Sequence, residues 1–145
     1  MKTVLFLCTG NYYRSRFAEL LFNRLAVDLE LGWRATSRGL ALERGVNNIG
    51  PISQHTIDAL RERGICAQEE SRFPIAASEA DMSAANHIVA LKQDEHLPLV
   101  KQKFPRSAQQ IEFWHIHDLD FATPRDAMAQ IDENVRGLIL RLISR

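Results

Sequence analysis

The sequence predicts an α/β fold in which helices cover both faces of a mostly parallel sheet. Short apolar runs typical of buried strands alternate with amphipathic helical segments, and no repeat interrupts this alternation. A chain of 145 residues with 46% hydrophobic side chains has enough apolar material for one core, so we expect residues 1–145 to form a single domain. In such sheets, ligands bind at the carboxyl ends of the strands.

The first half of the chain contains two predicted strand and helix pairs. Residues 2–7 form a continuous apolar run that predicts a buried strand, and residues 15–28 carry apolar side chains at helical spacing. Residues 33–37 favour a second strand. Residues 53–63 predict a helix, and Gly64 is its predicted C-cap.

The second half repeats the alternation. Residues 79–85 predict a short helix, and residues 87–91 a buried strand. Residues 110–116 predict another strand, which a polar loop connects to a long final helix over residues 126–143. Strands separated by helices in this way require crossover connections, which indicate parallel pairing.

Composition excludes several classes of function. Lys plus Arg equals Asp plus Glu at 18 each, so we expect neither nucleic acid nor a membrane surface as a partner. The apolar run near the N-terminus is too short for the hydrophobic region of a signal peptide. The two cysteines, Cys8 and Cys66, form no zinc spacing and no disulfide framework, so a reducing cytoplasm fits best. We interpret Cys66 as a structural, small hydrophobic side chain.

The junction between the first strand and the first helix, CTGNYYRS, contains more polar and charged residues than the end of a buried strand requires. Gly10 and Asn11 tolerate a left-handed backbone, so the loop can curl until its N–H groups form an anion-binding nest. The helix adds the positive end of its dipole, and the same field favours the thiolate form of Cys8. The predicted phosphate-binding residues are Thr9, Gly10, Asn11, Tyr12, Tyr13 and Arg14.

Three side chains of this loop have predicted catalytic tasks. Cys8 is the candidate nucleophile, and the planar guanidinium of Arg14 can bridge two phosphoryl oxygens, which a lysine could not do. Ser15 can donate its hydroxyl to the sulfur. The alternative is that Cys8 is a buried small hydrophobe, but a strand before it and a helix after it favour the catalytic interpretation. No metal or organic cofactor is implied, because the N–H groups and Arg14 supply the positive charge.

These residues resemble the low-molecular-weight protein tyrosine phosphatase family. The loop has the family's CxGNxxRS form at the family's N-terminal position, and similarity continues through Phe17-Ala18-Glu19 and Thr36-Ser37-Arg38-Gly39 to cover nearly the whole chain. The resemblance implies a three-layer α/β/α sandwich with a four-stranded parallel sheet and a phosphate-binding loop after strand 1. It also implies hydrolysis through a phosphocysteine intermediate, with Asn11 and Ser37 bracing the loop by hydrogen bonds.

Phosphomonoester cleavage also needs a proton for the leaving oxygen. A carboxylic acid above the loop would protonate that oxygen and then act as base on the attacking water. The resemblance places this acid after a tryptophan and before the last helix. The spacing from Trp114 favours Asp118, with Asp120 as the alternative, although neither is followed by the family's proline. We interpret Asp126 as a capping or first-turn acid of the final helix.

The residues expected to form the walls of the substrate-binding pocket differ most from those of the family. The aromatic pair that usually follows the acid is missing, so Phe121 or Tyr12 could supply its wall, and Tyr13 replaces a second cysteine that could protect Cys8. The predicted partner is a phosphotyrosine protein or a small aryl phosphate. Two alternatives stay open: an arsenate reductase, which needs two further cysteines where only Cys66 is available, and a non-catalytic anion-binding module.

Overall fold

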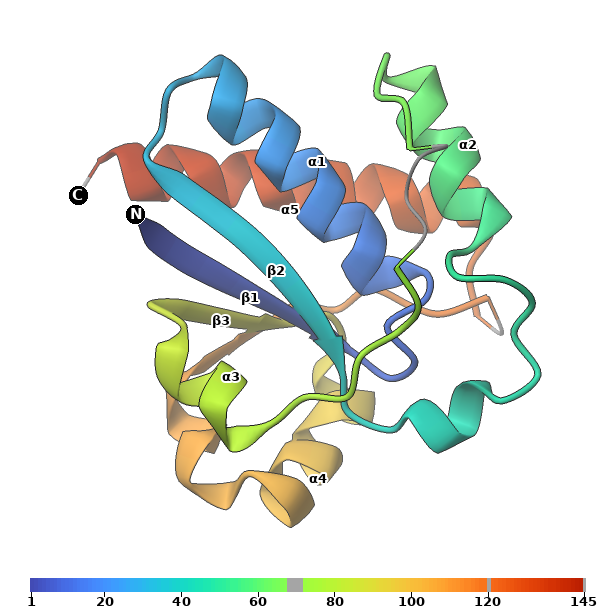
Figure 1. Ribbon diagram of the computed structural model, residues 1–145, viewed down its shortest axis with the longest axis vertical. Helices are drawn as coiled ribbons and strands as arrows, with labels where there is room; N and C mark the ends of the chain where they lie inside the picture. Colours follow the sequence, from blue (N-terminus) through green and yellow to red (C-terminus); the bar gives the residue numbers. More distant parts are fainter. Residues whose placement is uncertain (68–71, 120, 145) are drawn as a thin grey trace.

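The chain folds into three layers, with a parallel sheet between two groups of helices (Figure 1). The computed structural model describes residues 1–67, 72–119 and 121–144. The strand order in the sheet is β2-β1-β3-β4, and every pair is parallel. The strands are Lys2–Cys8 (β1), Trp33–Gly39 (β2), His87–Ala90 (β3) and Ile111–Phe113 (β4). The predicted α/β/α sandwich is thereby confirmed.

Helices cover both faces of this sheet (Figure 1). The helices are Arg14–Asp28 (α1), Gln54–Glu62 (α2), Glu79–Ala84 (α3), Gln93–Lys103 (α4) and Pro124–Ile143 (α5), with 3-10 turns at Leu42–Gly45 and Pro105–Gln110. One core cluster joins α1, α2 and α5 to the sheet, and a second joins α3 and α4 to the opposite face. Within the described ranges, none of these helices has both the length and the apolar character needed to cross a bilayer.

Strand β1 is central, and its side chains alternate between the two cores. Val4 and Phe6 belong to the cluster beneath α1 and α5, whereas Leu5 and Leu7 belong to the cluster beneath α3 and α4. All four are 0% exposed, which explains why the strand is a continuous apolar run rather than an alternating one. Cys8 ends this strand at the carboxyl edge of the sheet.

Two elements differ from the sequence-based expectation. Helix α4 was not predicted, because Pro98 lies inside it and removes one backbone donor, which normally argues against a helix interior. Strand β4 is shorter than the predicted residues 110–116. The chain leaves the regular ladder after Phe113 and forms an isolated antiparallel bridge between His115 and Lys92. This departure carries the following loop across the carboxyl edge of the sheet.

Candidate active site

The loop between β1 and α1 is held in a curled conformation. Asn11 has a φ of 52°, a left-handed conformation that asparagine tolerates better than most residues. The carbonyl of Cys8 accepts a hydrogen bond from Leu40 N at 2.8 Å, and that of Thr9 accepts one from Ala41 N at 2.9 Å. These bonds fasten the loop to the segment that follows β2, so its shape depends on the neighbouring strand.

The side chain of Asn11 is the hub of this loop, and it is 0% exposed. Its amide nitrogen donates to Ser15 Oγ and to Ser37 Oγ, both at 2.9 Å. Its amide oxygen accepts from Arg72 Nη1 at 3.0 Å and from Ile75 N at 3.1 Å. Both donors and both acceptor positions of the amide are therefore occupied. The contacts with Ser15 and Ser37 are the bracing that the family resemblance implied.

Arg72 is a supporting residue that sequence reasoning missed. Its Nη2 lies 3.1 Å from Glu19 Oε1 and 3.1 Å from Ser37 Oγ, in addition to its contact with Asn11. Glu19 is on α1, and Ser37 is on β2. Arg72 therefore ties a helix, a strand and the loop together. No spacing pattern links these distant positions, so the sequence alone carries no signal for the contact.

The thiol of Cys8 is buried, and its only described hydrogen-bond partner is Ser15. The sulfur lies 2.9 Å from Ser15 Oγ, and Cys8 is 2% exposed. Because Asn11 donates to the same Oγ, the proton of Ser15 is free to point at the sulfur. A hydroxyl in that position can donate to the sulfur, which is the role that the sequence analysis predicted for Ser15.

Arg14 is buried beside Cys8, at the first residue of α1. Its Nη2 lies 2.7 Å from Glu95 Oε2 and 3.4 Å from Asp118 Oδ2, and its Nη1 donates to the carbonyl of Ile116 at 3.0 Å. Burial tends to lower the pKa of Arg14, but the negative groups around it, Cys8 first among them, raise it above its ordinary value. The guanidinium is therefore charged at every pH relevant to the protein.

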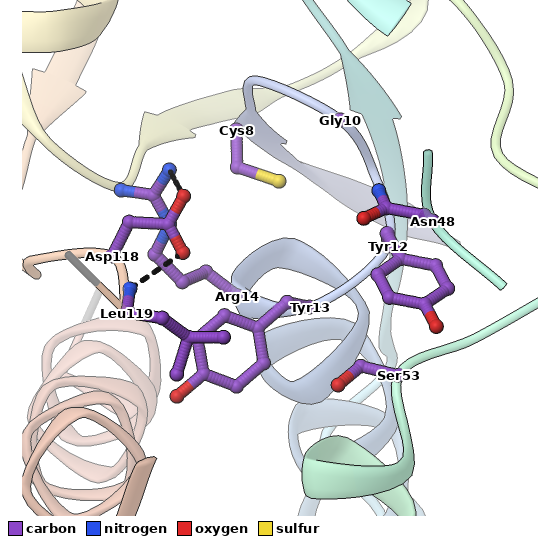
Figure 2. Close-up of a pocket in the computed structure, with 9 residues that line it drawn as sticks. All are labelled: Cys8, Gly10, Tyr12, Tyr13, Arg14, Asn48, Ser53, Asp118 and Leu119. Atoms are coloured by element: carbon purple, nitrogen blue, oxygen red, sulfur yellow. Dashed lines mark hydrogen bonds and ion pairs between the residues drawn. The ribbon is translucent and has the colours of Figure 1, made fainter. Parts of the chain in front are cut away.

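A pocket of about 230 Å³ opens between these groups (Figure 2). In Figure 2, Arg14, Asp118 and Leu119 lie on one side of the Cys8 sulfur, while Tyr12 and Asn48 lie on the other. The residues that line the pocket are Cys8, Gly10, Tyr12, Tyr13, Arg14, Asn48, Ser53, Asp118 and Leu119. The pocket thus brings together the predicted nucleophile Cys8, the phosphate-binding Arg14 and the favoured acid Asp118, although Asp118 follows Cys8 by more than a hundred positions in the sequence.

Two tyrosines give the pocket its aromatic character. The hydroxyl of Tyr12 donates to the carbonyl of Ile49 at 2.5 Å, which holds its ring at the pocket wall. The ring of Tyr13 also lines the pocket, with its hydroxyl directed away from Cys8 (Figure 2). Burial, with a further contribution from Asp118, raises the pKa of Tyr13 to about 12, so this phenol stays neutral.

Several other predicted residues lie elsewhere. Phe121 is 73% exposed and contacts Lys92 and His117 rather than lining the pocket, so the prediction that it walls the slot is wrong, whereas Tyr12 does line it. Asp120 lies outside the described residues. Asp126 is in the first turn of α5, as interpreted. Over the described ranges, no group of three or more His, Cys, Asp or Glu side chains is arranged to hold a metal ion.

Cys66 is exposed, which contradicts its interpretation as a structural, small hydrophobic side chain. It follows the turn at Gly64, where the backbone has a φ of 75°, and it lies at the edge of a surface pocket. The chain reaches the surface there because the helix before it ends at Glu62. The neighbouring Ala67 is the residue of this segment that enters the core.

Gly39 permits the close packing of β2 against the loop. A Cβ at this position would lie 2.9 Å from the carbonyl oxygen of Thr9 and 3.2 Å from Cβ of Asn11. We expect Gly39→Ala to lower the free energy of unfolding by about 1–3 kcal/mol, because the loop backbone must move. Urea denaturation measures this change. Gly137→Ala is the control: it meets open space within α5 and should raise stability by up to about 1 kcal/mol. Equal stability of Gly39→Ala and the wild type would contradict the close approach.

Comparison with known proteins gives a consistent family and fold. Residues 3–138 match the family model described as low molecular weight phosphotyrosine protein phosphatase. No curated protein sequence matches the chain. Among solved structures, a low molecular weight protein tyrosine phosphatase from T. tengcongensis is 27% identical with a TM-score of 0.75, and the match covers 99% of both chains.

Two further solved structures share the fold at lower identity. Wzb from Vibrio vulnificus, in complex with benzylphosphonate, is 18% identical with a TM-score of 0.81, over 97% of this chain and 98% of that one. The YwlE arginine phosphatase from Geobacillus stearothermophilus is 21% identical with a TM-score of 0.79, over 99% of this chain and 94% of that one.

Proposed function

The chain belongs to the low molecular weight phosphotyrosine protein phosphatase family, and from this membership we propose that it hydrolyses aryl phosphomonoesters through a phosphocysteine on Cys8. Enzymes of this family are cysteine-dependent phosphatases. One observation carries the assignment of roles: the sulfur of Cys8, the guanidinium of Arg14 and the carboxylate of Asp118 line the same pocket. The hydroxyl of Ser15, 2.9 Å from the sulfur, supports the thiolate.

The first chemical step transfers the phosphoryl group to sulfur. The thiolate of Cys8 attacks phosphorus in line with the leaving oxygen, and the bond between phosphorus and that oxygen breaks. The protonated carboxyl of Asp118 gives its proton to the leaving oxygen, so an alcohol or phenol departs. Arg14 and the loop N–H groups stabilise the charge on the phosphoryl oxygens during the transfer.

The second step releases the enzyme. The carboxylate of Asp118 accepts a proton from water, and the water oxygen attacks phosphorus as the bond between sulfur and phosphorus breaks. Inorganic phosphate leaves, and Cys8 returns to the thiolate form. Ser15 stabilises the sulfur as leaving group in this step, as it does for the nucleophile in the first.

The pocket walls favour an aromatic leaving group. Tyr12, Tyr13 and Leu119 present two rings and an aliphatic side chain, which suit a flat apolar ring better than a charged chain. We therefore expect higher kcat/KM with a phosphotyrosine peptide than with phosphoarginine, the substrate class suggested by the YwlE name. Measuring phosphate release from both substrates decides between them, and a preference for phosphoarginine would reverse this substrate proposal.

Asp118 is the proposed general acid, with Asp120 as its competitor. We expect Asp118→Asn to lower kcat for para-nitrophenyl phosphate by about 100-fold or more, because an amide cannot donate the required proton. The fall in rate on the basic side of the pH profile, where the acid loses its proton, should disappear in this variant. Asp120→Asn is the matched control and should keep both the rate and the profile. The reverse pattern would assign the acid to Asp120.

Two alternatives from the sequence are less well supported. An arsenate reductase is not favoured, because the family match is to phosphatases. A non-catalytic anion-binding module would bind phosphate but release none from para-nitrophenyl phosphate. We also propose the cytoplasm as the compartment, because both Cys8 and Cys66 are free thiols, which a reducing environment maintains.

A further inference from the structure

Glu95 faces the phosphate-binding loop from the opposite side of the sheet edge. It lies in the first turn of α4, the helix that the sequence did not predict. Its Oε2 is 2.7 Å from Arg14 Nη2, which is shorter than the 3.4 Å between the same nitrogen and Asp118. Glu95 is therefore the principal ionic partner of the guanidinium. Arg14 and Asp118 have roles in the proposed chemical steps, whereas Glu95 has none.

Three donors converge on Glu95 and fix its position. Thr9 donates its hydroxyl to Oε2, and Nε2 of His96 lies 3.1 Å from both that oxygen and the Thr9 hydroxyl oxygen. Nδ1 of His96 accepts from the N–H of Lys92 at 3.0 Å, so the ring proton is on Nε2, within reach of both the Thr9 hydroxyl and the carboxylate. Arg14 is the third donor.

The charge of Glu95 is as well determined as its position. Burial tends to raise the pKa of Glu95, but hydrogen bonds from His96, Arg14 and Thr9, together with the charge of Arg14, hold it well below its usual range. Burial lowers the pKa of His96, with a further contribution from Arg14, so this ring is neutral near pH 7. A fixed negative charge thus lies behind the guanidinium.

This arrangement determines how Arg14 is shared between two carboxylates. Glu95 and the carbonyl of Ile116 hold both terminal nitrogens of Arg14, and among the described residues none accepts a hydrogen bond from its Nε. Without Glu95, the buried guanidinium would have Asp118 as its one remaining carboxylate partner. An arginine that captures Asp118 favours the ionised carboxylate, whereas the first chemical step needs the protonated acid.

We propose that Glu95 is the positioning residue of this active site. It holds the guanidinium of Arg14 toward the phosphoryl group and, by satisfying its charge, keeps Asp118 available as the acid. The proposal rests on the proposed function, because it assumes that Arg14 binds the phosphoryl oxygens and that Asp118 carries the proton. Glu95 itself touches neither the substrate nor the reacting atoms.

Glu95→Gln tests this role, because it removes the charge and keeps the shape of the side chain. We expect kcat for para-nitrophenyl phosphate to fall by about 10- to 100-fold, because misplacing a group that positions the substrate lowers the rate by about this factor. The basic limb of the pH–rate profile should move to lower pH, because Arg14 then favours ionised Asp118. A purely structural role would lower the folded fraction without moving that limb. Asp94→Asn, an exposed neighbour in the same helical turn, is the matched control and should change neither quantity.

A double variant isolates the coupling with Asp118. In the Asp118→Asn background, Glu95→Gln should lower kcat by a smaller factor than in the wild type, because no acid remains to be captured. Multiplicative effects would overturn the proposed coupling. If Glu95→Gln does not fold, Glu95→Asp retains the charge at a shorter reach, which weakens its pairing with Arg14, and should move the basic limb in the same direction by a smaller amount.

The outcomes separate this proposal from the proposed function. A wild type that hydrolyses the ester, together with Glu95 variants whose kcat and pH profile match those of Asp94→Asn, would overturn the positioning role alone. An inactive wild type would instead overturn the phosphatase mechanism on which the positioning role of Glu95 depends. A Cys8→Ser variant that hydrolyses the ester as fast as the wild type would do the same. Thermal denaturation of each variant confirms that the rates compare folded proteins.

Discussion

Replacing Cys8 by serine will abolish hydrolysis of para-nitrophenyl phosphate, with kcat at least about a thousandfold below that of the wild type. A serine hydroxyl is a poor nucleophile without an adjacent base, whereas the thiolate attacks phosphorus directly. Cys8 and Ser15 lie in hydrogen-bond contact, and among the described residues no histidine lines the pocket that could activate a hydroxyl. Release of para-nitrophenol, followed by its absorbance, measures the rate.

Cys66→Ser is the control for this experiment, because Cys66 is exposed and is absent from the pocket lining. It should retain full activity. A Cys8→Ser variant as active as the wild type would remove the phosphocysteine from the mechanism. Mass spectrometry of the wild type, quenched during turnover, should detect a phosphoryl group on the peptide that contains Cys8.

Replacing Arg14 by lysine will lower kcat/KM by about 100- to 1,000-fold, although the charge is kept. A lysine ammonium cannot hold two phosphoryl oxygens at once, and losing one well-placed donor for transition-state charge costs about this much. The buried site intensifies the loss, because Glu95 approaches the present guanidinium at 2.7 Å and would lose part of its pairing. Steady-state kinetics with para-nitrophenyl phosphate measures the ratio.

Arg24→Lys is the matched control for the Arg14 variant. Arg24 is also on α1, but its side chain is 53% exposed and pairs with Asp28 within the helix. An exposed pair of this kind contributes little to stability. Full activity of Arg24→Lys and a large loss in Arg14→Lys would locate the effect at the pocket. An Arg14→Lys variant that retains kcat/KM would show that phosphoryl binding needs only the positive charge, and not the planar guanidinium of Arg14.

The strands, most helices and the loop could be predicted because each depends on local patterns. The run before Cys8 is apolar on both faces, and the helix after Arg14 has regular apolar spacing. The family resemblance predicted an acid after Trp114, and spacing favoured Asp118, which lines the pocket because the segment after β4 follows the same sheet edge as the loop after β1. Local order and sheet topology were sufficient for the strands, the helices and the loop, whereas the acid also needed the resemblance.

The contacts of Glu95 and Arg72 could not be predicted, because tertiary packing alone creates them. Glu95 is separated from Arg14 by 81 positions, and Arg72 from Asn11 by 61. The helix that carries Glu95 was itself not predicted, because Pro98 lies inside it. Phe121 was misplaced for a related reason: its exposed ring contacts Lys92, 29 positions earlier, which the residues next to it do not reveal.

The complete occupation of the Asn11 amide has a consequence for ligand binding. Because its four hydrogen bonds form when the protein folds, the loop already has its curled shape before any oxyanion arrives. Binding then incurs little loss of conformational entropy, and even a small rigid anion can gain the full attraction of the loop N–H groups proposed to bind it. Asparagine is also irreplaceable by its relatives here: aspartate lacks the two donors, and glutamine is one methylene too long for this buried position. Folding of the protein therefore also forms the anion-binding conformation of the loop, because both depend on the buried amide of Asn11.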